Sequence, residues 1–130
     1  MRTPSSYDYA IVRVVPRVER EEFINAGVIL SSQEQDFLGA RIELDERRLL
    51  ALDASVDLEA VRDNLSSITL ICAGGAAAGP IGKLSPRERF HWLVAPRSTI
   101  IQTSPVHSGR CQDPAAALDH LLRTMVRARP

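Results

Sequence analysis

Three strand-like segments follow one another in the first third of the sequence, with no helix-like segment between them. Tyr7–Val15 is rich in apolar and β-branched residues, Arg13 interrupts its apolar run, and a proline follows it directly. Gly27–Ser31 is a run of Val, Ile and Leu, and Phe37–Leu44 alternates apolar with polar residues beyond a short polar loop. Strands joined by short loops pair antiparallel, so these segments predict an antiparallel sheet.

Helical patterns occupy the middle and the end of the chain. A short helix is expected over 45–52, and a longer one begins around 55 to 57 and continues to 72, where glycines at 74 and 75 end it. The clearest helix covers 113–126, because Asp113 can cap it, Pro114 suits its first position and apolar residues recur along one face. These helices supply the second layer that a sheet needs in order to bury one face.

Between the two longer predicted helices, the sequence favours a second pair of strands. Residues 87–94 alternate Arg and His with Phe, Trp and Val, which is typical of a half-buried strand. Residues 99–103 predict another strand after a turn, and 104–113 predict a long loop. The Gly- and Ala-rich stretch 73–82 is expected to be a flexible connector.

Together these segments predict an α+β fold in the order βββααββα. With 130 residues, of which 45% are hydrophobic and 25% charged, the chain has the profile of one globular domain over 1–130, with an ordered core at about 7–127. We expect an antiparallel sheet of about five strands with helices packed on one face, rather than a parallel sheet whose strands alternate with helices.

Charge and segment composition exclude several classes of protein. The 16 basic residues balance 16 acidic ones, so no long-range field favours nucleic acid or an anionic membrane. No apolar stretch approaches the length of a membrane span, and the residues before Tyr7 lack the regions of a secretory signal. We therefore expect a cytoplasmic protein in which Cys72 and Cys111 are free thiols.

No cofactor, metal or catalytic motif has the required spacing. The glycines before Lys83 do not match a phosphate-binding loop, and no serine lies in a nucleophile elbow. His107 and Cys111 are spaced to reach one ion from a loop, but a four-coordinate site needs two further ligands that the sequence does not supply. We predict no cofactor and no metal.

The region from Tyr7 to Gly27 holds the most informative polar residues. Arg13, Glu22 and Asn25 interrupt apolar strand residues, and polar groups in such positions cost free energy unless they are paired. One interpretation is architectural, in which Arg13 pairs with Glu22 while Asn25 and Gly27 supply unusual backbone torsions. The other is a polar pocket or partner-binding surface. This surface would also include the predicted strand face at 87–91 and the nearby turn at 97–99. Its candidate residues are Arg13, Arg17, Glu22, Asn25, Arg89, His91, Arg97 and Ser98.

The chain resembles a bacterial family known as domain of unknown function 3037. The resemblance covers nearly the whole chain and lies in YDYAIVRVVPRVEREEFINAGVIL, RIELDERRLLALD and RERFHWLVAPRSTIIQTSPVHSG. The most recognisable pattern of the family stands here as Arg13, Pro16, Glu22, Asn25 and Gly27. The resemblance also implies a gene neighbour that encodes a HipA-like kinase, and hence a regulatory or partner role.

We therefore expect a non-catalytic accessory protein that binds another protein, with a HipA-like kinase as the suspected partner. The alternative is an enzyme or binder that acts on a phosphorylated small molecule or nucleotide. In that case Arg13, Arg17 and Arg97 would hold anionic oxygens, and His91 or His107 would transfer protons. A pocket in which these residues converge would favour the alternative, and their dispersal would disfavour it.

Overall fold

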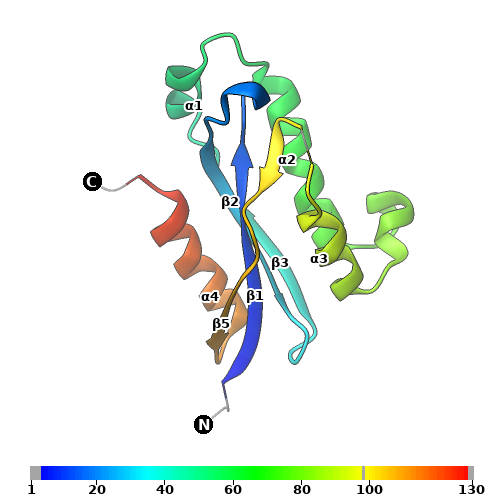
Figure 1. The fold of residues 1–130 in the computed structure, drawn as a ribbon. Coiled ribbons are helices and arrows are strands. Elements are labelled where there is room, and N and C mark those ends of the chain that lie inside the picture. The colour runs from blue at the N-terminus through cyan, green and yellow to red at the C-terminus, as the bar shows by residue number, and fades with distance from the viewer. Residues whose placement is uncertain (1–3, 98, 129–130) are drawn as a thin grey trace.

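The computed structural model describes residues 4–97 and 99–128, which form a central antiparallel sheet with helices on both faces (Figure 1). The strand order is β3-β2-β1-β4. β4 pairs with the C-terminal part of β1, and β5 pairs with the N-terminal part along the same edge. β1 is thus the central strand, with β2 along one side and β4 and β5 end to end along the other. The strands are β1 (Ser5–Val14), β2 (Ile24–Ser32), β3 (Phe37–Ile42), β4 (Ile101–Thr103) and β5 (His107–Cys111).

The helices divide between the two faces of the sheet. In Figure 1, α2 and α3 lie on one side of the strands and α4 on the other. The α-helices are α1 (Glu46–Leu52), α2 (Leu58–Ala73), α3 (Pro86–Val94) and α4 (Pro114–Leu121); shorter turns are η1 (Val18–Arg20), η2 (Ala76–Lys83) and η3 (Leu122–Val126), which extends α4.

Alternation along β1 explains the two-sided arrangement. Val12 and Val14 point to the face covered by α1, α2 and α3, where Leu65 and Phe90 complete the larger apolar core. Ile11 points to the opposite face, where Val28 and Leu30 pack against the α4 and η3 residues Leu118, Leu121, Leu122 and Val126. Each strand of the hairpin β1–β2 is therefore buried on both faces.

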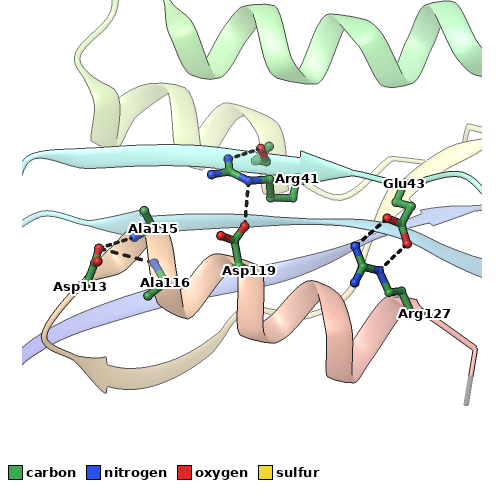
Figure 2. Close-up of polar contacts among 8 residues, drawn as sticks. Arg41, Glu43, Asp113, Ala115, Ala116, Asp119 and Arg127 are labelled. Carbon is green, nitrogen blue, oxygen red and sulfur yellow. Dashed lines mark hydrogen bonds and ion pairs between the residues drawn. The ribbon is translucent and has the colours of Figure 1, made fainter.

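Polar contacts at the β3 edge hold α4 in register (Figure 2). Arg41 Nε lies 3.0 Å from Asp119 Oδ1, and Arg127 donates to both carboxylate oxygens of Glu43. Asp113 caps α4 by accepting from the backbone N–H groups of residues 115 and 116, as the sequence predicts. The ion pairs are exposed, so the apolar contacts of α4 contribute more to its docking than the charges do.

The structure confirms the α+β class and the five-stranded antiparallel sheet, and it corrects three details. Residues 87–94 form α3, not a strand, because Ser85 and Glu88 make a capping box and Pro86 occupies the first helical turn. The predicted loop 104–113 contains β5, and one helix, α4, lies on the face that the prediction left open.

The segment predicted as a flexible connector, 73–82, leads from the end of α2 through a glycine turn into the 3-10 turns of η2. Gly74 has a φ of 74°, and a Cβ there would lie 3.0 Å from the guanidinium of Arg89. Glycine at 74 therefore permits both the turn that ends α2 and the approach of the arginine that caps this helix.

Within the described residues, no single helix is long and apolar enough to cross a membrane. The pair α2 and η2 reaches that length and composition only together, across a 62° bend.

Candidate functional site

Two rows of three polar side chains cross the sheet, one on each face and at opposite ends of β1. The first row is Ser31, Asp8 and Ser108, from β2, β1 and β5, on the face that α3 covers. Arg87 of α3 donates to Asp8 Oδ2 at 2.7 Å and to Ser31 Oγ at 3.1 Å, and Ser108 Oγ donates to Asp8 Oδ1 at 2.6 Å. Every member of this row has a partner within the chain, and we call it the closed row.

Asp8 in the closed row is held in its ionised form. The hydrogen bond from Ser108 and the adjacent Arg87 guanidinium lower the pKa of the Asp8 carboxyl below its usual value, against an opposing effect of burial. His91, four residues after Arg87 on α3, adds a weaker effect in the same direction. The closed row is thus a charge-compensated contact that fixes α3 on the sheet.

The second row is Asn25, Arg13 and Gln102, from β2, β1 and β4, on the α4 face. Asn25 Nδ2 donates to the Met125 carbonyl of η3 at 3.0 Å, and Gln102 Nε2 donates to Thr99 O at 2.9 Å. Asn25 Oδ1 and Arg13 Nε are both sealed from solvent, and neither has a hydrogen-bond partner in the described part of the chain. We call this the open row.

Arg13 packs against an aromatic ring and has no counter-charge among the residues that the structure describes. Its guanidinium carbon lies 4.2 Å from the centre of the Phe23 ring, and no carboxylate of residues 4–97 or 99–128 is within ion-pair distance. Phe23 is 42% exposed, and Met125, whose carbonyl accepts from Asn25, is 44% exposed. The open row thus combines an uncompensated cation with exposed apolar side chains.

The structure brings Arg13 and Asn25 together as neighbours but places Glu22 elsewhere. Glu22 pairs with Arg20 next to η1, so the predicted Arg13–Glu22 pair is wrong. The unusual torsions predicted for Asn25 and Gly27 are also wrong, because neither has a positive φ, whereas Glu21, with a φ of 57°, is left-handed. A Cβ on Gly27 would lie 2.7 Å from the Arg41 carbonyl, so glycine allows β2 and β3 to approach closely there.

Arg17 lies outside the open row. Its Nε is 3.3 Å from Asp53, beside a cavity of about 360 Å³ that Arg20 and Glu22 also line. Because both arginines of this cavity already pair with carboxylates, the cavity has little free positive charge for an anion.

The candidate residues Arg89 and Arg97 bind backbone carbonyls at the ends of helices. Arg89 is 8% exposed and donates to the Ile71, Cys72 and Leu84 carbonyls, which caps α2. Arg97 stacks on Trp92 and donates to two carbonyls at the end of α3, while His91 is exposed on α3. The predicted single strand face of Arg87, Arg89 and His91 is therefore wrong, because these residues lie on a helix, where Arg89 points away from the face that Arg87 and His91 share. Ser98 lies outside the described residues.

The spacing of His107 and Cys111 could let both bind one metal ion only if the two residues lay in a loop. Both residues lie in β5, where four residues span about 13 Å, which is too far for two ligands of one ion. In the described part of the chain, no three His, Cys, Asp or Glu side chains gather as a metal site would require.

Sequence reasoning missed three residues of the open-row surface: Phe23, Gln102 and Met125. Gln102 joins the row only through the β1–β4 register. Met125 belongs by helical periodicity to the buried face of the last helix, but η3 turns with π-helical spacing and leaves it exposed. Phe23, two positions before Asn25, is the one signal that was available, since an aromatic residue near a strand arginine can stack on its guanidinium.

A protein-family model described as "Protein of unknown function (DUF3037)" matches residues 9–126. No curated protein and no solved structure matches the chain.

Proposed function

The chain belongs to the DUF3037 family, whose description states no function, and from the open row we propose that it is a non-catalytic accessory module that binds another protein. The observation that carries the proposal is a pair of buried atoms, Arg13 Nε and Asn25 Oδ1, that have no hydrogen-bond partner among the described residues and lie beside the exposed side chains of Phe23 and Met125. Unsatisfied buried polar groups cost free energy, and natural folds retain them chiefly where function requires them.

The surface also has the composition of a binding site. Aromatic residues, Met and Arg are enriched in the cores of protein interfaces, and all three occur around the open row. As a more specific proposal, resting on the family resemblance, the partner is a HipA-like kinase and the complex forms in the bacterial cytoplasm.

The geometry gives less support to the alternative, a phosphorylated small molecule or nucleotide. Arg13 lies on the α4 face, and Arg97 is bonded to carbonyls at the end of α3. His107 stacks near Tyr9 on the α4 face, whereas His91 is on α3 across the sheet. None of the five main cavities of the described residues is lined by two of these residues.

Site-specific photo-crosslinking in the cells of origin tests the binding module. A photoreactive phenylalanine analogue replaces Phe23 in one variant and Leu70 in the control, since Leu70 is 47% exposed on α2. We expect a discrete protein adduct from position 23 and none of that size from position 70. Equal adducts at both positions, or none at position 23 in a folded variant, would overturn the proposal.

A further inference from the structure

Three of the described arginines are half-buried or buried, and they differ in their partners. Arg89 donates to three backbone carbonyls, and Arg87 donates to Asp8 and Ser31. Arg13 makes no such contact within residues 4–97 and 99–128. Within residues 4–97 and 99–128, two of these cations thus have polar partners and the third has none, so a second protein could supply its counter-charge.

The position of the Arg13 guanidinium determines which of its atoms a partner can reach. The Arg13 guanidinium carbon lies 4.2 Å from the centre of the Phe23 ring, and the N–H donors of a guanidinium lie in its own plane and point outward from its edge. Nε is buried and has no partner among the described residues, whereas the terminal nitrogens are not among the buried atoms without a partner, so they are the donors that we expect a partner to reach. Two parallel donors at the edge of a guanidinium match the two oxygens of a carboxylate.

The closed row shows the complementary arrangement already formed. There the central strand residue is an acid, Asp8, and a helix brings an arginine to it. In the open row the central strand residue is an arginine, and the nearby acid Glu22 is engaged by Arg20. A carboxylate brought by a second protein would give the open row the charge balance that the closed row has.

We propose that the open row is the docking point for one Asp or Glu side chain of the partner protein, carried on a segment whose apolar residues cover Phe23 and Met125. This inference rests on the proposed function. A carboxylate fits better than a phosphate, because Arg13 offers one charge without a counter-charge among the described residues, while Arg20 and Arg127 are already paired with Glu22 and Glu43.

A random peptide library displayed on phage and selected on the purified full-length chain tests the inference. We expect the enriched peptides to share an acidic residue flanked by large apolar residues. Arg13→Gln is expected to weaken binding of an enriched peptide about ten- to a hundredfold, the equivalent of losing a hydrogen bond to a charged group. Arg13→Glu is expected to select Lys or Arg in place of the acid.

Arg47→Glu is the matched control, since Arg47 is exposed on α1 and outside both rows, and it is expected to leave peptide binding unchanged. Thermal unfolding establishes that each variant is folded. Peptides enriched without an acid, peptides indifferent to Arg13→Gln, or no enrichment at all would each overturn the acid docking. Binding of inorganic phosphate or an oligonucleotide at Arg13, or self-association that Arg13→Glu abolishes, would also overturn it. In each of the first three cases, a crosslinked adduct at position 23 would still support the proposed protein-binding function. Failure of the acid docking can therefore be told apart from failure of the proposed function.

Discussion

The closed row and the open row are built alike and completed differently. Each places three polar side chains side by side on three strands, with a charged residue on β1 at the centre. In the closed row, α3 delivers Arg87 to Asp8, whereas in the open row η3 contributes only the Met125 carbonyl to Asn25. A polar residue within a strand is therefore architectural when the fold also supplies its partner.

The difference originates in the helices that cover each end of β1. The capping box of α3 and the Arg89 contacts with α2 hold α3 over the N-terminal half of β1, on one face. On the opposite face α4 docks over Ile11 and Leu30, and η3 ends near Asn25. The Arg13 guanidinium is therefore left under a single aromatic ring.

The largest effect is expected from Arg89→Met, which removes the anchor that positions α3 over the closed row. Three backbone carbonyls would lose a charged donor in a buried site, and we expect a loss of about 3 kcal/mol or more in unfolding free energy. Chemical denaturation measures this loss.

A thiol reagent supplies a local measure of the same change. Burial raises the pKa of Cys72 to about 12, so native Cys72 should react slowly. In Arg89→Met the end of α2 should open and Cys72 should be labelled faster. A variant with wild-type stability and unchanged labelling would show that Arg89 does not anchor α3.

Arg87→Met opens the closed row directly and is expected to cost about 1–3 kcal/mol, because it leaves the half-buried Asp8 carboxylate without its cation. Asp8→Asn should cost less on the Arg87→Met background than in the wild type, since the two side chains share one contact. Denaturant unfolding of the wild type, both single variants and the double variant measures this coupling. Strict additivity would contradict the paired character of the closed row.

Acid unfolding probes the charge at the centre of the closed row. The folded-state pKa of Asp8 is lowered, chiefly by Ser108 and also by Arg87, so ionised Asp8 stabilises the fold at neutral pH. That contribution is present above the ordinary pKa of 3.8 and is lost as pH falls through the lower folded-state value. Asp8→Asn should therefore be less stable than the wild type at pH 7, with the gap closing as pH falls below about 4. A gap that is independent of pH would contradict the assignment.

Strand propensity and turn spacing were sufficient to predict the three consecutive strands β1, β2 and β3. The β-branched residues of β1 and the short β2–β3 connection determine an antiparallel hairpin locally. They were insufficient for α3, since the eight residues 87–94 alternate in polarity and fit a strand as well as a helix, and the capping box at Ser85 was the deciding signal. β5 escaped prediction because its exposed residues lack an apolar pattern, and pairing with β1 stabilises it.

The candidate site was also predicted only in part from local sequence signals. Arg13 and Asn25 were found because charged and amide side chains stand out within apolar strands. The residues that contact them were not found. Gln102 reaches the row through a register between strands that are far apart in the sequence. Glu22, which was expected to pair with Arg13, pairs locally with Arg20. Which polar residues meet across a sheet depends on register, and a single sequence does not encode register locally.

The smallest effect on stability is expected from Arg13→Met, and its sign separates the two rows. The substitution keeps an apolar stem against Phe23 and removes a buried Nε that has no partner, a gain that offsets the lost stacking of about 0.5–1 kcal/mol. Stability should therefore remain within about 1 kcal/mol of the wild type or rise, whereas the same substitution at Arg87 lowers it. Parallel denaturant titrations of the two variants test this contrast. If Arg13→Met lost as much stability as Arg87→Met, Arg13 would be completing the fold of its own chain, and the open row would have no need of a second protein.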